Sequence, residues 1–323
     1  MKKAKINRLL SSLSSLLCFT NITRINTITG GLSNPCFKVE ADGNDYFAKK
    51  TNVQLFETEL YLTNILAKQA IAPTVIYFNN QWIISQFISG TNLTESQLTL
   101  AEKIEISISL MANFHQLVNK TSDKKITDLV PRLHIINAIN DLLTPQIEPS
   151  LQDMIKQMAN VMSELIIPEI TSSKATLRCC HGDINFSNVL FDDNQRPWLI
   201  DFEYACIAPI EFDIAMLLAV NNIQMTELNQ VITCYEKVTN IALSKPLCHY
   251  FLALSYLING LWYYSQHLNK PFSAKSSTST PTSTKNPTSR NFLSLAKQQW
   301  QLYDQLINHL SLAIREKKLA TLI

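Results

Sequence analysis

Three oxygen-bearing side chains are spaced as in enzymes that transfer phosphoryl groups. Asp183 precedes Asn188 by five residues, and Asp201 follows the short apolar run 198–200. A transferring phosphoryl group and its leaving diphosphate carry several negative charges, which metal ions and oriented donors must neutralise. Magnesium prefers oxygen ligands, and one carboxylate with one amide would hold it without overcharging the site. The pattern therefore predicts phosphoryl transfer, with Asn188 and Asp201 as Mg²⁺ ligands.

Asp183 remains to handle the proton. Its separation from Asn188 is that of the kinase catalytic loop, in which an Asp accepts the proton of the attacking hydroxyl. We therefore predict that Asp183 is the catalytic base and that His181 braces the loop by hydrogen bonding. The alternative is a polar turn between two strands. The ordered series that continues through a turn at 192–195 to Asp201 favours the catalytic interpretation.

A phosphate-binding segment is expected upstream. The chain has no Gly-x-x-x-x-Gly-Lys-Ser/Thr loop, so a P-loop fold is disfavoured. Instead Gly30 and Gly31, two of only six glycines, and Asn34 precede a predicted hairpin with strands at 36–40 and 46–49. Adjacent glycines let a backbone approach a ligand closely, although a plain tight turn would also use them. We assign these three residues to nucleotide binding.

Lys49 ends the second strand of this hairpin, and the segment 53–68 after it has helical periodicity. Glu59 lies inside that predicted helix. In kinases a strand lysine holds the donor's phosphates and is oriented by a glutamate on the next helix. We predict the pair Lys49 and Glu59, with Lys50 and Glu57 as second choices. The alternative for each is an ordinary surface charge.

The elements that must position these residues indicate an α+β fold. Hairpins and one helix precede 89–91, and mostly helix follows, with the short catalytic strands embedded in it. We therefore predict an N-terminal nucleotide-binding lobe at 1–90, with a leading amphipathic helix, and a catalytic and substrate lobe at 91–323. Segment 271–291, rich in Ser, Thr, Pro and Lys, is predicted to be a disordered insertion. The leading helix would present five leucines on one face: Leu9, Leu10, Leu13, Leu16 and Leu17.

Composition excludes several classes of function. The 323 residues are 46% hydrophobic, which is enough for a large core. A net charge of +2 without a dense basic stripe gives nucleic acid no electrostatic footprint. No apolar run is long enough to span a bilayer. Seven cysteines without a Cys-x-x-Cys pair indicate neither a disulfide framework nor a zinc ribbon, so we expect a reducing cytoplasm.

Together these segments resemble the choline and thiamine kinases of the aminoglycoside phosphotransferase group. The resemblance covers most of the chain. It is carried by Gly30-Gly31-Leu32-Ser33-Asn34, Tyr46-Phe47-Ala48-Lys49, Ile71-Ala72-Pro73, the run 83–90, the run 181–188 and the run 199–205.

The resemblance implies a bilobal, protein-kinase-like fold and a kinase that uses ATP and Mg²⁺. It also implies that Asp183 is the catalytic base, that Asn188 and Asp201 bind magnesium, and that Lys49 contacts phosphate. The hinge-like run around Phe87 would present backbone groups to adenine.

The acceptor is expected to be a small cationic alcohol. Trp262 lies in an aromatic cluster on a predicted helix, and aromatic faces attract quaternary ammonium groups. Glu203 adds acidic character near Asp201. The choline enzymes of the family have a Trp-Gly-Leu-Trp pattern here, and Asn259 replaces its first Trp. We therefore expect thiamine first and choline or ethanolamine next. The alternatives are an aminoglycoside or sugar phosphotransferase and a nucleotide-binding pseudokinase; the sequence does not indicate an oligomeric state.

Overall fold

The computed structural model describes residues 2–28, 34–51, 55–120, 124–269 and 291–310. These residues divide into two compact units. Unit 1 comprises 1–132, 177–213 and 227–242, and unit 2 comprises 133–176, 214–226 and 243–323. Gly30, Gly31 and nearly all of the predicted insertion at 271–291 lie outside the described residues; Asn291 is described as the N-cap of a helix.

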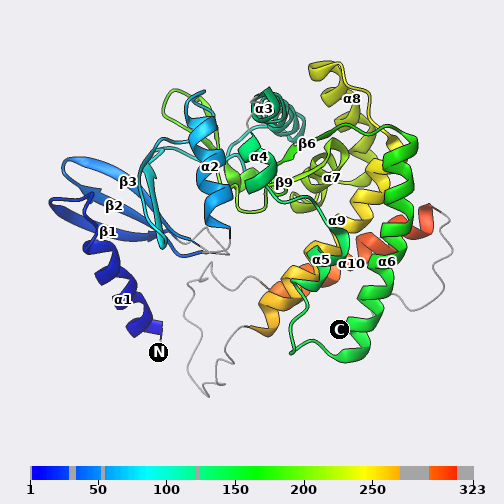
Figure 1. Ribbon diagram of the computed structural model, residues 1–323, viewed down its shortest axis with the longest axis horizontal. Coiled ribbons are helices and arrows are strands. Elements are labelled where there is room, and N and C mark those ends of the chain that lie inside the picture. Colours follow the sequence, from blue (N-terminus) through cyan, green and yellow to red (C-terminus); the bar gives the residue numbers. More distant parts are fainter. Residues whose placement is uncertain (1, 29–33, 52–54, 121–123, 270–290, 311–323) are drawn as a thin grey trace. The chain divides into compact units, whose positions relative to one another are not determined.

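Unit 1 contains a five-stranded antiparallel sheet in the order β1-β2-β3-β5-β4 (Figure 1). Its strands are β1 (Ile22–Ile28), β2 (Cys36–Ala41), β3 (Asn44–Lys50), β4 (Val75–Phe78) and β5 (Trp82–Gln86). The predicted hairpin is confirmed as β2 and β3. Its turn is shorter than predicted, because Asp42 and Gly43 both have positive φ, as a two-residue hairpin turn requires.

The helix α1 (Lys2–Ser14) precedes this sheet and packs against it. Leu13 and Leu16 are buried with Phe37, Val39 and Trp82, and the Trp82 indole donates a hydrogen bond to Ser12. The leading helix is therefore confirmed. The prediction was wrong for Leu17, whose side chain is 93% exposed. The helix ends at Ser14, so the helical spacing that would have turned Leu17 inward no longer applies.

The segment 177–209 of unit 1 forms two short antiparallel strand pairs. β6 (Leu177–Cys180) pairs with β9 (Cys206–Pro209), and β7 (Val189–Phe191) pairs with β8 (Pro197–Leu199). A 3₁₀ turn, Phe186–Asn188, leads directly into β7. The loop that carries Asp183 thus runs from the end of β6 to this turn, and Asp201 follows β8.

Helices complete unit 1: α2 (Phe56–Ala67), α3 (Leu100–Lys120), α4 (Lys124–Leu129) and α8 (Leu228–Thr239). The helix α2 packs against β4 and α3. The helix α7 (Ile210–Val220) carries Asp213 in its first turn.

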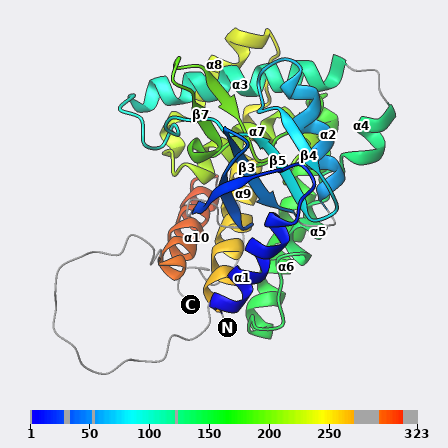
Figure 2. The ribbon, with the colours of Figure 1, turned by 90° about the vertical axis from the view of Figure 1, so that its left-hand side faces the viewer.

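Unit 2 is helical: α5 (Ile135–Asn140), α6 (Pro149–Ser172), α9 (Lys245–Leu268) and α10 (Phe292–His309). The helices α9 and α10 lie side by side (Figure 2). A Cβ atom at Gly260 would lie 2.1 Å from the Trp300 indole, so glycine permits this close packing. Within the described ranges, no helix combines the length and the apolar character needed to cross a bilayer.

Gly90 joins the sheet of unit 1 to its catalytic segment. The segment after it forms backbone hydrogen bonds with β7, from Phe191 N to Thr91 O at 2.8 Å and from Leu93 N to Val189 O at 2.8 Å. Gly90 has φ +140°, and a Cβ atom there would lie 2.0 Å from the carbonyl oxygen of Phe191. No other residue fits this junction without moving backbone.

We expect Gly90→Ala to lower the free energy of unfolding by about 2–4 kcal/mol, because it adds backbone strain and a clash with rigid backbone. Chemical denaturation would measure the loss. Gly43→Ala is the matched control: Gly43 also has positive φ, but a Cβ atom there would meet nothing within 4 Å. That variant should cost only about 1 kcal/mol. Equal losses for the two variants would contradict the proposed clash.

Candidate active site

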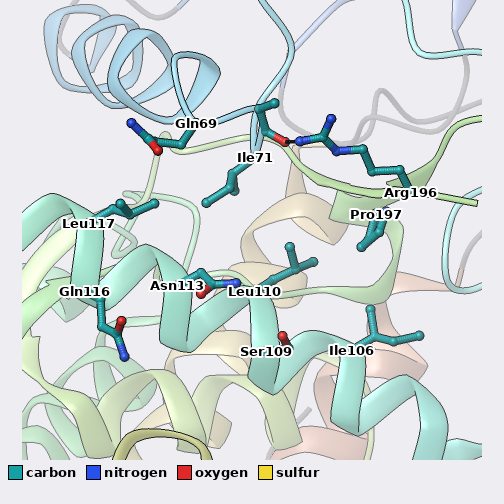
Figure 3. A pocket seen from close by; sticks show the side chains of 11 residues that line it. Gln69, Ile71, Ile106, Ser109, Leu110, Asn113, Gln116, Leu117, Arg196 and Pro197 are labelled. Atoms are coloured by element: carbon teal, nitrogen blue, oxygen red, sulfur yellow. Dashed lines mark hydrogen bonds between the residues drawn. The ribbon is translucent and has the colours of Figure 1, made fainter.

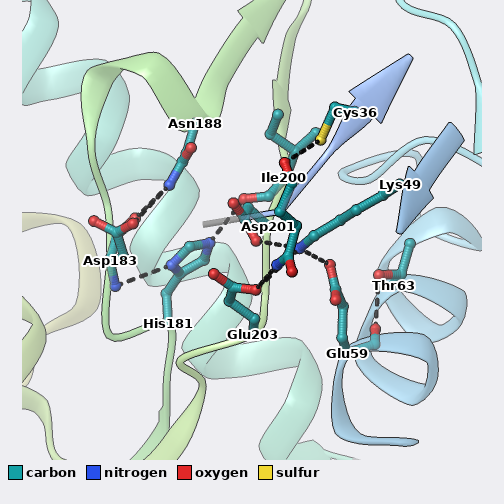
Figure 4. A network of polar contacts seen from close by, with 11 residues as sticks. Cys36, Lys49, Glu59, Thr63, His181, Asp183, Asn188, Ile200, Asp201 and Glu203 are labelled. Carbon is teal, nitrogen blue, oxygen red and sulfur yellow. Dashed lines mark hydrogen bonds and ion pairs between the residues drawn. The ribbon is translucent and has the colours of Figure 1, made fainter. Parts of the chain in front are cut away.

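The ammonium group of Lys49 lies among three carboxylates of unit 1 (Figure 4). Its Nζ atom is 2.7 Å from Glu59 Oε1, 2.6 Å from Asp201 Oδ1 and 3.4 Å from Glu203 Oε2. The strand β3 supplies the lysine and the first turn of α2 supplies Glu59. Lys49 is 5% exposed and Glu59 is 6% exposed. Because little water reaches these two groups, each charge is stabilised mainly by its charged neighbours.

The second choices from the sequence do not form this pair. Lys50 Nζ donates to Gln81 at 2.9 Å and lies 5.3 Å from the Trp82 ring centroid. Glu57 is exposed. The alternation of β3 explains the difference, because Lys50 points to the opposite face of the sheet from Lys49.

The site carries more negative than positive charge. Burial disfavours a charged Lys49, but Asp201, Glu59 and Glu203 together raise the pKa of its ammonium above the usual value. Burial raises the pKa of Glu59 to about 7, against the lowering effect of Lys49. One lysine cannot neutralise three carboxylates. The oxygen-rich, anionic donor set therefore fits a divalent cation such as Mg²⁺.

Asp183 and Asn188 are linked directly. Asn188 Nδ2 donates to the Asp183 carbonyl oxygen at 3.0 Å and to Asp183 Oδ2 at 3.1 Å. The amide oxygen of Asn188 is the atom left to bind a metal ion. Burial, and then the charge of Asp201, raise the pKa of Asp183 to about 7. A carboxylate with such a pKa can accept a proton near neutral pH.

His181 connects the Asp183 loop to the segment that carries Asp201. Its Nδ1 accepts a hydrogen bond from Asp183 N at 3.2 Å, so its Nε2 donates to the Ile200 carbonyl oxygen at 3.1 Å. Burial lowers the pKa of His181, which keeps the ring neutral. The bracing role predicted for His181 agrees with these contacts.

Asp201 has an unusual backbone conformation. Its φ is +70°, in the left-handed region that few residues other than glycine adopt. Such conformations persist where the surrounding structure imposes them, and they are concentrated at functional sites. Here the conformation accompanies the contact between Asp201 and Lys49.

Asn34 and Phe87, both assigned to nucleotide binding, lie in different surroundings. Asn34 Nδ2 donates a hydrogen bond to Glu203, so the end of the β1–β2 connection is tied to the carboxylate group around Lys49. Phe87 directly follows β5, and its amide donates to the Asp45 carbonyl oxygen at 3.4 Å. The Lys38 ammonium lies 4.7 Å from the centroid of the Phe87 ring.

A separate groove of about 500 Å³ lies between α3 and the connection from α2 to β4 (Figure 3). Its described lining combines the amides of Gln69, Asn113 and Gln116 with aliphatic side chains such as Ile71 and Leu110. The lining residues include no carboxylate. The groove shares no lining residue with the Lys49 site and is distinct from it.

A family model described as choline/ethanolamine kinase matches residues 25–306. The chain belongs to this family. The match covers both the Lys49 group and the Asp183 loop, and it confirms the resemblance inferred from the sequence.

Curated relatives in the choline/ethanolamine kinase family are distant. Probable choline kinase 2 of Arabidopsis thaliana is 23% identical over 162 residues, which is 49% of this chain and 45% of the relative. Probable choline kinase 1 of the same plant is 22% identical over 182 residues, 55% of this chain and 49% of the relative. The chain thus spans about half the length of these curated relatives.

Solved structures confirm the predicted α+β, protein-kinase-like fold. The choline kinase of Cryptosporidium parvum Iowa II has a TM-score of 0.66 and 20% identity, and the match covers 89% of this chain and 90% of that one. The choline kinase LicA of Streptococcus pneumoniae has a TM-score of 0.68 and 15% identity, with 96% and 100% covered. An aminoglycoside phosphotransferase of Streptomyces rimosus has a TM-score of 0.57 and 17% identity, with 77% and 98% covered.

Trp262, the predicted acceptor residue, lies in an aromatic group of unit 2. Its half-buried ring meets Tyr263 and Phe292 edge to face, with centroids 5.3 Å and 6.2 Å away. Tyr263 and Phe292 are stacked at 6.3 Å. These rings join the end of α9 to the start of α10.

Sequence reasoning missed one feature of the site, namely that Glu203 is part of the Lys49 group. It was expected to contact the substrate, but its buried carboxylate lies beside Lys49 and accepts from Asn34. Its position only two residues after Asp201 in the sequence was the available signal.

Proposed function

We propose that this member of the choline/ethanolamine kinase family is an ATP-dependent kinase that phosphorylates a hydroxyl group of a small cationic alcohol. The observation that carries the proposal is the arrangement within unit 1. Lys49 is paired with both Glu59 and Asp201, and Asn188 is bonded to Asp183. A phosphate-binding lysine, a metal-binding carboxylate and a base are the parts that phosphoryl transfer requires.

Each residue has a distinct task in this proposal. Asp183 accepts the proton of the acceptor hydroxyl as the hydroxyl oxygen attacks the γ-phosphate. Lys49 contacts the phosphates of ATP and is kept in place by Glu59. Asn188 and Asp201 would hold Mg²⁺, which would supply positive charge to neutralise the phosphates. Gly30, Gly31 and Asn34 approach the phosphates, and the backbone around Phe87 approaches adenine.

For the acceptor, family membership favours choline and ethanolamine, whereas the Asn259 substitution favours thiamine. The aromatic group of Trp262, Tyr263 and Phe292 supports all three, because a ring face attracts a cation through its quadrupole. Glu203 adds a negative charge beside Lys49, which would attract a cationic acceptor. We propose that choline, ethanolamine and thiamine form the acceptor class.

An aminoglycoside or sugar acceptor is the second candidate, and the similarity in fold to an aminoglycoside phosphotransferase supports it. A polyhydroxylated acceptor is usually bound by hydrogen bonds, and the aromatic group in unit 2 is less suited to that task. A pseudokinase, which would bind nucleotide without turnover, is disfavoured because Asp183 and the Lys49 group are all present.

The test is an ADP-release assay with Mg²⁺-ATP against choline, ethanolamine, thiamine, homoserine and an aminoglycoside. We expect turnover with at least one of the first three and background rates with the last two. Asp183→Asn protein, purified in the same way, corrects for contaminating kinases. Turnover with the aminoglycoside alone would replace the proposed acceptor class. ATP binding without turnover of any acceptor would support the pseudokinase.

A further inference from the structure

A second polar cluster in unit 1 is fully buried and has no part in the mechanism above. It consists of Asp213 in the first turn of α7, His115 on α3 and Tyr235 on α8. Their exposed fractions are 0%, 1% and 0%. His115 Nε2 is 3.0 Å from Asp213 Oδ2, and His115 Nδ1 is 2.8 Å from the Tyr235 hydroxyl.

Asp213 joins this cluster to the catalytic loop. Its Oδ2 accepts a hydrogen bond from His181 N at 2.8 Å, and its Oδ1 accepts from Gly182 N at 2.8 Å. Burial opposes the charged carboxylate, but hydrogen bonds and the neighbouring histidines lower the pKa of Asp213 below its usual value. The carboxylate is therefore ionised and acts only as an acceptor.

The direction of the hydrogen bonds follows from this charge. Because Asp213 only accepts, His115 Nε2 carries the proton that it donates. In the tautomer that carries its proton on Nε2, Nδ1 is an acceptor, so the Tyr235 hydroxyl donates to it. The chain of donors runs from Tyr235 to His115 and from His115 to Asp213, which also receives the two loop amides.

A metal ion is a poor alternative for this cluster, although His115, Asp213 and Cys180 offer ligand atoms within 4.8 Å of one another. Both ring nitrogens of His115 and both oxygens of Asp213 already take part in hydrogen bonds. The geometry therefore favours a hydrogen-bonded brace.

We propose that Tyr235 is a positioning residue, whose hydroxyl fixes the His115 ring so that Asp213 holds the amides of His181 and Gly182 and thereby places Asp183. This inference rests on the proposed function, because Asp183 is its catalytic base. Close packing around Gly182 leaves the loop little room to move. This glycine has φ +77°, and a Cβ atom there would lie 2.4 Å from the Tyr204 carbonyl oxygen.

Without the Tyr235 hydroxyl, Nδ1 of His115 becomes a buried acceptor that lacks this donor. Leaving such a group without its partner is costly, so the ring is expected to tilt, and its bond to Asp213 loses alignment. Asp183 is the next residue after the two braced amides, and its own amide donates to His181. A small displacement therefore reaches Asp183, whereas Lys49 donates its hydrogen bonds to Glu59 and Asp201.

The test is Tyr235→Phe, with Tyr256→Phe as the matched control. Tyr256 is 1% exposed, and its hydroxyl has no hydrogen-bond partner within the described part of the chain. We expect Tyr235→Phe to lower kcat about tenfold and to leave KM for ATP and acceptor within about twofold. Amide hydrogen exchange in the peptide 177–185 should quicken in Tyr235→Phe and not in Tyr256→Phe.

A double-mutant cycle tests whether Tyr235 acts through His115. In a His115→Gln background the side-chain amide can still donate to Asp213, but the ring nitrogen that Tyr235 serves is gone. Tyr235→Phe should then cause no further loss of kcat, because the two residues act as one unit. Additive losses, or an unchanged kcat and unchanged exchange in Tyr235→Phe alone, would overturn the proposal.

Failure of the proposed function would look different. If the wild-type protein transfers no phosphate to any acceptor, the kinase assignment fails, and the exchange measurement still decides the brace. If the wild-type protein is active and Tyr235→Phe matches it in kcat and exchange, only the positioning role fails.

Discussion

Asp183→Asn is expected to reduce kcat about 1,000-fold while nucleotide affinity changes by less than about twofold. The asparagine has nearly the same shape, and its oxygen can still accept from Asn188, which now donates to Asp183 Oδ2 at 3.1 Å. What it loses is the ability to take a proton from the acceptor hydroxyl. Steady-state ADP release would measure kcat, and a fluorescent ATP analogue titrated against the protein would measure affinity.

The control for this variant is Asp153→Asn on α6, which makes the same change at an exposed position. It should match the wild-type protein in both assays. If Asp183→Asn kept more than about a tenth of the wild-type kcat, another group would be the base. If it lost nucleotide binding as well, the residue would have a structural role that the hydrogen bond to Asn188 does not explain.

Local pattern was enough to predict the elements around the site. Alternating residues in 36–40 and 46–49 predicted β2 and β3, and helical spacing in 53–68 predicted α2. These patterns depend on neighbours in the chain.

The contacts that join distant segments could not be predicted from such patterns. Lys49 and Asp201 are 152 residues apart in the sequence and lie 2.6 Å apart in the structure. His115 and Tyr235 are 120 residues apart, and neither lies in a recognisable motif. Their partnership depends on how α3 and α8 pack, which hydrophobic periodicity leaves open. In the structure His115 is buried and bonded to both Tyr235 and Asp213.

The resemblance to a known family and the chemistry of individual residues predicted different parts of the site. The spacing from Asp183 to Asn188 predicted a base and a metal ligand, because it matches the kinase catalytic loop, in which the reaction needs both together. The Phe87 hinge came from the resemblance and the Trp262 acceptor group from a cluster of aromatic residues, and both stay predictions. Glu203 was assigned to the acceptor from its charge alone, and in the structure its carboxylate lies beside Lys49.

Asp201→Asn is expected to raise the Mg²⁺ concentration for half-maximal activity at least about tenfold and to lower kcat about 100-fold. Asparagine is the informative replacement because Asp201 has φ +70°, a conformation that asparagine tolerates and alanine does not. The variant thus removes the charge of a metal ligand and keeps the backbone. A magnesium titration of ADP release at saturating ATP would measure both effects.

The protein should remain folded in this variant. The Asp201 side chain is 32% exposed, so its bond to Lys49 contributes less than about 1 kcal/mol, and Lys49 keeps Glu59 and Glu203 as partners. Asp42→Asn is the matched control, because Asp42 also has a positive φ, 51°, in the turn between β2 and β3. It should leave the magnesium dependence unchanged. A normal magnesium titration for Asp201→Asn would exclude Asp201 as a metal ligand, since no other change in this variant offsets the lost carboxylate.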